Sequence, residues 1–217
     1  MKAKTLKHAV TSFFTAIKTK NIVPIEHMVD DAKVLDKKVA LITGGSGGIG
    51  YAIAKSFIES GCHVIITGTN AEKLKSCVEK LGDSSKGIFV SQKIAKYFVE
   101  NKIKGHILNI SSSTGGEPGW LAYRISKQAI ENLTLGLAQK LSPYGIFVNG
   151  IAPGSTATNL LNYKDGDSIA TRDNVIGRMV MPDEIATYAK MLVSDLGNMV
   201  VGETIYISGG RGKFDIR

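Results

Sequence analysis

A glycine-rich segment between an apolar run and a helical pattern places the strongest constraint on the fold. The apolar run, Val-Ala-Leu-Ile at 39–42, suits a strand buried on both faces. It leads into Thr-Gly-Gly-Ser-Gly-Gly-Ile-Gly at 43–50, and residues 51–60 then follow a helical pattern. Glycines allow a pyrophosphate to approach the backbone closely, and the helix N-terminus offers unpaired N–H groups. The sequence therefore predicts a nucleotide site at this turn.

The next segment repeats the alternation of strand and helix. His-Val-Ile-Ile-Thr at 63–67 reads as a second buried strand, and residues 71–81 read as a helix. This alternation predicts an α/β fold with a doubly wound parallel sheet, in which the loop after the second strand reaches the adenosine ribose. That loop carries no acid, and Thr69 and Asn70 could bind a 2′-phosphate, with Lys73 one turn further on. The loop favours NADP(H) over NAD(H).

A tyrosine and a lysine on a third expected helix are candidates for proton transfer. A buried strand at 105–110 ends in serines 111–113, and Tyr123 and Lys127 lie on a helix that extends to about residue 141. Four positions apart, the two side chains share a helix face. A nearby lysine cation stabilises the phenolate and lowers the tyrosine pKa from its usual value of about 10. Many helices carry a tyrosine and a lysine at this spacing by chance. The position of this pair after the serines is what favours a catalytic role for it.

Composition excludes several classes of protein. The chain has 217 residues, of which 43% are hydrophobic and 21% charged, as in a globular protein. Two cysteines, Cys62 and Cys77, are too few for a disulfide scaffold and indicate a reduced, cytoplasmic protein. No apolar run reaches the roughly 18 residues of a membrane-spanning helix. The histidines are scattered, so we expect no metal site.

The net charge of +8 is concentrated near the N-terminus. Residues 1–25 hold five lysines and no acid, so the remainder is close to neutral and we expect no nucleic-acid partner. Apolar residues share one face of an expected helix in this segment: Leu6, Val10, Phe13, Phe14 and Ile17. The helix could make a peripheral membrane contact through residues 1–20, or pack on the domain or a partner subunit. A signal peptide is a third reading, although no clear cleavage site follows.

Taken together, the motifs resemble those of the short-chain dehydrogenase/reductase family. The matching segments are Thr43–Gly50, Ile110–Gly115, Tyr123–Lys127, Tyr144–Asn149, Pro153–Thr158 and Gly202–Gly210. The resemblance implies a single Rossmann-type domain with three α/β/α layers at 37–210. Residues 1–36 would form a helical extension with a linker, and residues 211–217 a short tail.

The resemblance also implies roles for individual residues. Tyr123 would act as general acid/base, Lys127 would lower its pKa and hold the nicotinamide ribose, and Ser112 would hydrogen-bond the substrate oxygen. The residues that would bind the cofactor pyrophosphate are Gly44, Ser46, Gly48, Ile49 and Gly50. Those that would line the nicotinamide side are Pro153, Gly154, Thr156 and Thr158, and residues 155–181 would form the substrate loop.

The implied function is an NAD(P)(H)-dependent oxidoreductase that interconverts a small-molecule carbonyl and an alcohol by hydride transfer. The alternative is an inactive nucleotide-binding or scaffolding remnant. The family resemblance further implies a homodimer or homotetramer, built partly from helices at 87–101 and 123–141.

One part of the family pattern is absent. Residues 82–86 run directly into residues 87–92, which resemble the helix that follows the family's fourth strand. Neither the third nor the fourth strand is recognisable, nor is the Asn-Asn-Ala-Gly motif, and Ser84 or Ser85 stands in place of a catalytic asparagine. A strand–helix–strand unit needs about 30 residues, so we expect either that sequence is missing near Lys86–Gly87 or that the chain is a truly shortened, inactive variant. Without the central fourth strand, the first strand either pairs with the strand at 106–110 or leaves a gap.

Overall fold

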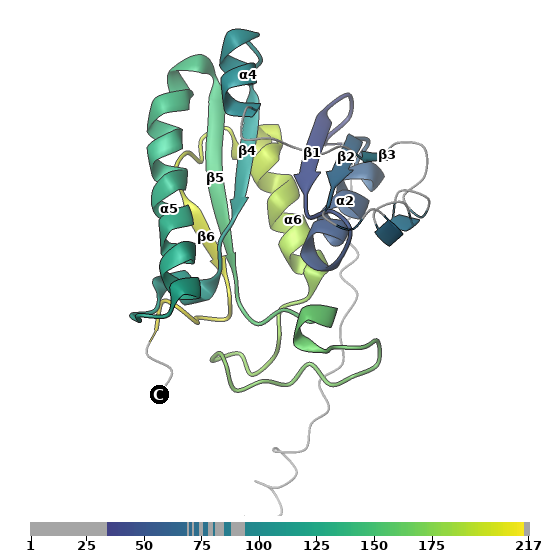
Figure 1. The fold of residues 1–217 in the computed structure, drawn as a ribbon, viewed down its shortest axis with the longest axis vertical. Helices are drawn as coiled ribbons and strands as arrows, with labels where there is room; N and C mark the ends of the chain where they lie inside the picture. The colour runs from purple at the N-terminus through teal and green to yellow at the C-terminus, as the bar shows by residue number, and fades with distance from the viewer. Residues whose placement is uncertain are drawn as a thin grey trace, which may run out of the picture.

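Parallel strands flanked by helices make up the molecule (Figure 1). The computed structural model describes residues 34–68, 70, 72–73, 76–77, 80, 85–87 and 94–214. Within these ranges the strands form two three-stranded sheets. The first sheet has the order β1 (Val39–Thr43), β2 (His63–Thr67), β3 (Ser85–Gly87). The second has the order β4 (Gly105–Ile110), β5 (Ile146–Pro153), β6 (Thr204–Ile207).

The first sheet contains a strand that sequence analysis did not find. β1 pairs with β2 from Val39 opposite His63 to Thr43 opposite Thr67, and β3 pairs with β2 in parallel. β3 is Ser-Lys-Gly, without the apolar run that marks a buried strand, so only backbone pairing reveals it. It runs through Lys86 and Gly87, where the junction was expected. The expected start of a helix at Gly87 is therefore wrong, and the described helix begins at Ile94.

The second sheet holds the longer strands. β4 pairs with β5 from Gly105 opposite Ile146 to Ile110 opposite Ile151, and β6 pairs with the second half of β5. The run at 105–110 is thus a strand, as predicted. Each of these strands ends at the same edge of the sheet, and the long segment between β5 and α6 lies below that edge in Figure 1.

Helices cover both faces and complete three layers. On one face, α2 (Gly48–Glu59) packs against α6 (Pro182–Val193), and Phe57 and Ile185 belong to one buried cluster with residues of β1, β2 and β5. On the other face, α4 (Ile94–Glu100) and α5 (Ala122–Leu141) cover β4 and β5 through a second cluster. Short 3-10 turns complete the described elements: η1 (Ser113–Gly116), η2 (Ser142–Tyr144), η3 (Asn159–Leu161) and η4 (Asp195–Gly197).

β1 is less buried than its sequence predicts. Its side chains were expected to be buried on both faces, yet Val39 is 68% exposed and Leu41 38%. Ala40 and Ile42, on the other face, pack against the first cluster. β1 pairs with β2 along one edge, and no strand of the described residues pairs along the other. Of the two arrangements expected without a fourth strand, the structure has the gap.

The folded unit extends slightly beyond its expected N-terminal bound. Leu35 is 1% exposed within the first cluster, and its N–H donates to the carbonyl of Ser60 at 3.1 Å. The amphipathic pattern at 6–17, with the expectations attached to residues 1–20, lies outside the described residues. In the ranges that are described, no helix is both long and apolar enough to cross a bilayer.

Candidate active site

The glycine turn joins β1 to α2 as the sequence predicts. Gly44 has a φ of +69°, a left-handed conformation that favours glycine. A Cβ on Gly50 would collide with the carbonyl oxygen of Gly44, so this close approach requires glycine. α2 begins at Gly48 with no acidic residue in its first turn. Ser46, Ile49 and the glycines therefore surround a helix N-terminus whose partial positive charge suits a phosphate.

A lysine also lies at this turn. The Lys73 Nζ is 2.8 Å from the position that a Cβ on Gly47 would occupy. Asn70 accepts a hydrogen bond from the Lys73 N–H at 2.8 Å, an interaction that fixes the start of the helical segment. Thr69 lies outside the described residues. In the sequence Lys73 lies one turn beyond the loop, and only the tertiary structure brings its side chain to the glycine turn.

The segment after β5 meets the glycine turn. Pro153 ends β5, and the Gly154 N–H donates to the carbonyl of Ile207 at 2.8 Å. The Thr156 hydroxyl donates to the carbonyl of Gly154 at 2.9 Å, and the methyl carbon of Thr158 lies 3.5 Å from a Cβ built on Gly48. A pocket of about 480 Å³ lies between them, lined by Gly48, Ala157, Thr158, Asn159, Tyr163, Lys164, Asp165, Met181, Pro182 and Asp183.

The structure also brings the serine segment to Tyr123 and Lys127. The Lys127 Nζ lies 5.6 Å from the centre of the Tyr123 ring and donates to the carbonyl of Ile110 at 3.4 Å. The Ser111 hydroxyl donates to the carbonyl of Lys127 at 2.9 Å. The Ser112 hydroxyl shares a hydrogen bond of 3.0 Å with that of Thr114. Tyr123 is 58% exposed, so a substrate can reach it.

Glu131 supports this arrangement and was missed by sequence analysis. Its carboxylate accepts hydrogen bonds from the Ser111 hydroxyl at 3.1 Å and the Tyr206 hydroxyl at 2.8 Å. Burial raises the pKa of Tyr206 above its ordinary value, and the bond to the Glu131 carboxylate raises it further. Glu131 thus ties the serine segment to α5 and β6. Its position one turn after Lys127 was the only signal in the sequence.

An ion-pair network links the expected substrate loop to the start of α5. The Arg211 Nε donates to Glu117 at 2.8 Å, and its Nη1 lies 3.3 Å from Asp173. Arg211 Nη1 also donates to the Ser155 hydroxyl at 3.1 Å, and Ser155 donates to Asp173 at 2.6 Å. Arg124 pairs with the other Glu117 oxygen at 3.0 Å. Arg211 falls in the segment expected to be a tail.

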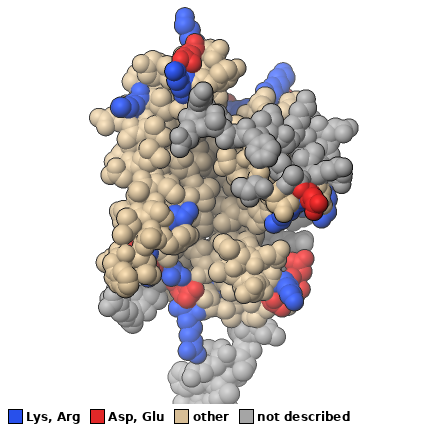
Figure 2. Space-filling view, viewed as in Figure 1, with Lys and Arg blue, Asp and Glu red and all other residues tan. Residues whose placement is uncertain are grey.

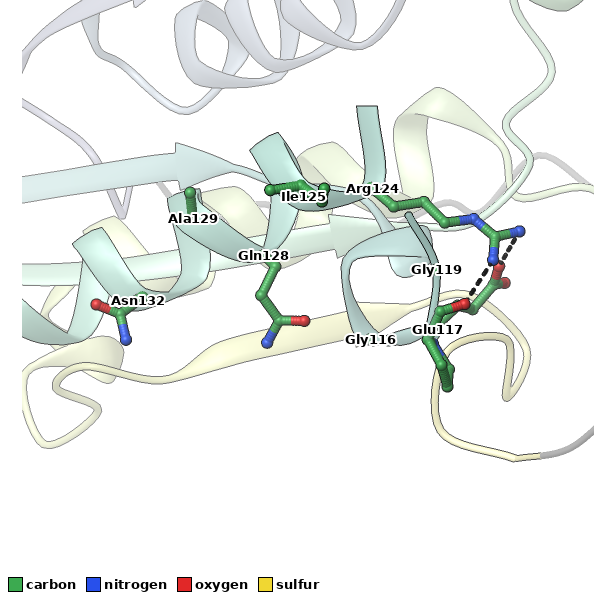
Figure 3. Close-up of a pocket in the computed structure, with 9 residues that line it drawn as sticks. Gly116, Glu117, Gly119, Arg124, Ile125, Gln128, Ala129 and Asn132 are labelled. Carbon is green, nitrogen blue, oxygen red and sulfur yellow. Dashed lines mark hydrogen bonds and ion pairs between the residues drawn. The ribbon is translucent and has the colours of Figure 1, made fainter. Parts of the chain in front are cut away.

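A larger hollow of about 520 Å³ is lined by Glu117 and Arg124 of this network and by one side of α5. Figure 3 shows Ile125, Gln128, Ala129 and Asn132 on one side of α5, with Arg124 extended toward Glu117. At helical spacing this side is opposite to the one that carries Tyr123 and Lys127. The hollow is therefore not part of the candidate site. No group of residues in the described ranges could hold a metal ion.

Family models match both halves of the chain. A model described as short chain dehydrogenase matches residues 38–93, and one described as enoyl-(acyl carrier protein) reductase matches residues 83–211. A 3-oxoacyl-[acyl-carrier-protein] reductase of Rickettsia felis is 30% identical, covering 81% of this chain and 97% of the relative. An L-rhamnose 1-dehydrogenase (NADP(+)) of Thermoplasma acidophilum is 28% identical, covering 80% and 95%.

Solved structures show the same fold. The 3-ketoacyl-(acyl-carrier-protein) reductase of Brucella melitensis complexed with NADH matches with a TM-score of 0.69 and 23% identity, over 82% of this chain and 99% of the other. A putative gluconate dehydrogenase from Agrobacterium tumefaciens matches with a TM-score of 0.74 and 20% identity, over 86% and 100%. The Rossmann-type α/β fold predicted from the sequence is confirmed. The chain belongs to the short-chain dehydrogenase/reductase family of NAD(P)-dependent oxidoreductases.

Proposed function

We propose that this protein interconverts a small-molecule carbonyl and an alcohol, with Ser112, Tyr123 and Lys127 as its catalytic residues. The observation that carries the proposal is the approach of the Lys127 ammonium to the Tyr123 ring, at 5.6 Å, beside the serine segment. Since the pair lies on a half-exposed face of α5, a substrate oxygen can reach both groups.

Each residue has a separate part in the proposed reaction. The bound nicotinamide supplies or accepts the hydride. In the direction of reduction, Tyr123 gives its hydroxyl proton to the substrate oxygen, and the Lys127 cation stabilises the phenolate that remains. The Ser112 hydroxyl donates a hydrogen bond to the same oxygen, where negative charge develops as the hydride arrives. Glu131 holds Ser111, and through it the serine segment, in position.

The glycine turn fits a dinucleotide. Gly44 has open space where a Cβ would lie, and Gly50 lets the turn fold closely against the N-terminus of α2, so a pyrophosphate can approach the N–H groups there. Pro153, Gly154, Thr156 and Thr158 would face the nicotinamide half. Preference for NADP(H) over NAD(H) is part of the proposal, because the Lys73 ammonium at Gly47 adds positive charge near the expected 2′-phosphate.

The relatives favour an active enzyme over an inactive remnant. They are named as reductases of 3-oxoacyl groups on acyl carrier protein and as a rhamnose dehydrogenase. We propose a 3-oxoacyl thioester as the first substrate class to test and a sugar as the second. A cytoplasmic location belongs to the same proposal, since both cysteines are free thiols.

We further propose a homodimer or homotetramer whose subunits meet at the outer side of α5, the side that carries Ile125 and Leu133. Ile125 and Leu133 on this side are 56% and 54% exposed, and Tyr97 on α4 is 55% exposed. A Cβ on Gly136 would meet no atom within 4 Å, so a helix of a second copy can approach closely there. Exposed apolar side chains on a helix surface are typical of a contact between subunits.

The test is NADPH oxidation with a 3-oxoacyl thioester by the full chain and two variants. Tyr123→Phe should lower kcat at least about 100-fold, because the proton donor is lost, while NADPH binding measured by fluorescence stays within twofold. Tyr144→Phe, on an equally exposed tyrosine outside the site, is the matched control and should keep full activity. Equal turnover by Tyr123→Phe and the control would refute the proposed mechanism.

A further inference from the structure

The chain turns back at the end of β6 and carries Arg211 toward two other segments. Gly209 and Gly210 have φ angles of +62° and +94°, left-handed conformations that favour glycine. The Arg211 N–H donates to the carbonyl of Ser208 at 3.4 Å, and the Ser208 hydroxyl donates to the carbonyl of Arg211 at 2.8 Å. The backbone of Arg211 is therefore held by the second sheet, and its side chain extends from a fixed point.

One partner of the Arg211 guanidinium lies between the proposed catalytic residues. Its Nε donates to Oε1 of Glu117 at 2.8 Å, and Arg124 pairs with the other oxygen of Glu117 at 3.0 Å (Figure 3). Glu117 follows Ser112 in the chain and precedes Tyr123, and its side chain is only 21% exposed. The ion pair thus fixes the segment that joins the proposed substrate-binding serine to the proposed proton donor.

The other partners lie on the nicotinamide side of the proposed site. Nη1 of Arg211 donates to the Ser155 hydroxyl at 3.1 Å and lies 3.3 Å from Asp173, and Ser155 donates to Asp173 at 2.6 Å. Ser155 directly follows Gly154, which we place beside the nicotinamide. Gly154 packs closely on the end of β6, because a Cβ on it would lie 2.8 Å from the Cα of Ser208. One guanidinium therefore contacts both segments between which a hydride would pass.

The chemistry of arginine suits such a link. Its guanidinium is planar and presents N–H donors in a rigid fork, so Nε and Nη1 hold their partners at a fixed separation. The Arg211 and Glu117 side chains are 24% and 21% exposed, and charged groups that are largely shielded from water form stronger hydrogen bonds. A lysine ammonium is a point charge on a flexible stem and cannot reproduce this fork.

We infer that Arg211 is a positioning residue for hydride transfer, which sets the separation between the segment that holds the substrate oxygen and the segment that faces the nicotinamide. The inference rests on the proposed function for the identity of these two segments. Reacting atoms must approach within about 3–3.5 Å, and a displacement of about 1 Å can cost about 100-fold in rate. Arg211 contacts neither reactant in this role and acts through Glu117 and Ser155.

The first experiment follows a single turnover of bound NADPH with a 3-oxoacyl thioester. Arg211→Gln should lower the rate constant of NADPH oxidation about tenfold, because the two segments are no longer linked. The amplitude, which counts correctly folded enzyme, should stay unchanged. Arg211→Lys keeps the positive charge but not the fork, so its rate constant should also fall. A loss of amplitude at an unchanged rate constant would show a merely structural role and overturn the inference.

Two further variants test the link itself. Arg172→Gln removes an exposed arginine next to Asp173 and should keep the full rate constant. Ser155→Ala should lower the rate constant, and its combination with Arg211→Gln should lower it no further, since both changes break the same link. Additive losses in the double variant would mean that Arg211 does not act through Ser155, and the inference would fail.

The second experiment needs no turnover. Trp120 is the only tryptophan of the chain and lies between Glu117 and Tyr123, and reduced nicotinamide absorbs light at the wavelengths that tryptophan emits. Energy transfer from Trp120 to bound NADPH therefore reports the separation of the two segments. The distribution of Trp120 fluorescence lifetimes should broaden in Arg211→Gln and remain as in the unchanged chain in Arg172→Gln.

Equal lifetime distributions in the unchanged chain and Arg211→Gln would contradict the inference, whatever the activity. If the distributions differ as expected but the unchanged chain reduces no carbonyl, only the proposed function is contradicted.

Discussion

Arg211 and Glu117, 94 positions apart in sequence, are joined by a hydrogen-bonded ion pair of 2.8 Å between Nε and Oε1. Both side chains are about three-quarters buried, and Arg211 also contacts Ser155 and Asp173 of the segment between β5 and α6. Figure 2 shows few charged side chains across the middle of the face in view, with most of them toward its ends and edges. The pair therefore connects the expected substrate loop to the start of α5.

Arg211→Gln should release this loop. We expect limited proteolysis within residues 160–178 to become about three- to tenfold faster, and the free energy of unfolding to fall by about 1–2 kcal/mol, because bonds between charged groups are lost. The exposed Arg172 lies in the same loop, and Arg172→Gln is the control. Equal cleavage rates for the two variants would show that the network does not restrain the loop.

Lys73→Ala should reduce the preference for NADPH over NADH. In our proposal the Lys73 ammonium, which lies at Gly47, forms an exposed ion pair with the 2′-phosphate of NADPH. Without it, we expect the ratio of the Kd for NADH to the Kd for NADPH to change by roughly five- to tenfold. The measurement is fluorescence titration with each cofactor. Lys80→Ala removes an exposed lysine from the same helical segment and should leave the ratio unchanged. A similar change in both variants would indicate a general effect of net charge.

His106 should make the fold sensitive to acid. Burial lowers the pKa of His106, and the positive charge of Lys38 lowers this pKa further. The hydrogen bond of 3.1 Å with Asn198 and the nearby Asp195 raise the pKa, but burial outweighs them. Below about pH 6.5 the unfolded chain binds a proton that the folded chain does not. The free energy of unfolding should therefore fall as the pH drops below that value, and be retained above it.

His106→Gln removes this contribution. Urea denaturation between pH 5 and 8 should give a flatter profile for the variant than for the unchanged chain on the acidic side. His63→Gln, at an exposed histidine, controls for the loss of a surface imidazole. Parallel profiles for the unchanged chain and His106→Gln would contradict the assignment.

Leu133→Glu should disrupt the proposed subunit contact. A carboxylate on the outer side of α5 would be desolvated against a second copy, which is costly, while the monomer fold would keep the side chain in water. Light scattering after size-exclusion chromatography should show a lower mass for the variant at the same concentration. Leu160→Glu, at an exposed leucine in η3, should leave the mass unchanged. A monomeric unchanged chain would refute the assembly proposal.

Local pattern was sufficient for much of the fold and of the candidate site. The runs at 39–42, 63–67 and 105–110 each became a strand, since runs rich in Val and Ile favour extended, paired backbone. The glycine turn was equally readable, because Gly44 and Gly50 meet backbone requirements that no other residue meets. The spacing of Tyr123 and Lys127 placed them together, because a helix brings residues four apart onto one face.

Tertiary structure alone decided the rest. β3 has no apolar signature and exists through pairing with β2, while Glu131 and Arg211 gained roles from partners distant in sequence. The exposure of Val39 and Leu41 depends on whether a neighbour lies beside β1, which its own residues cannot encode. Sequence order therefore determined the family, the glycine turn and the tyrosine–lysine pair. Long-range packing determined the division into two sheets, because strand edges are satisfied only by segments that the chain brings to them.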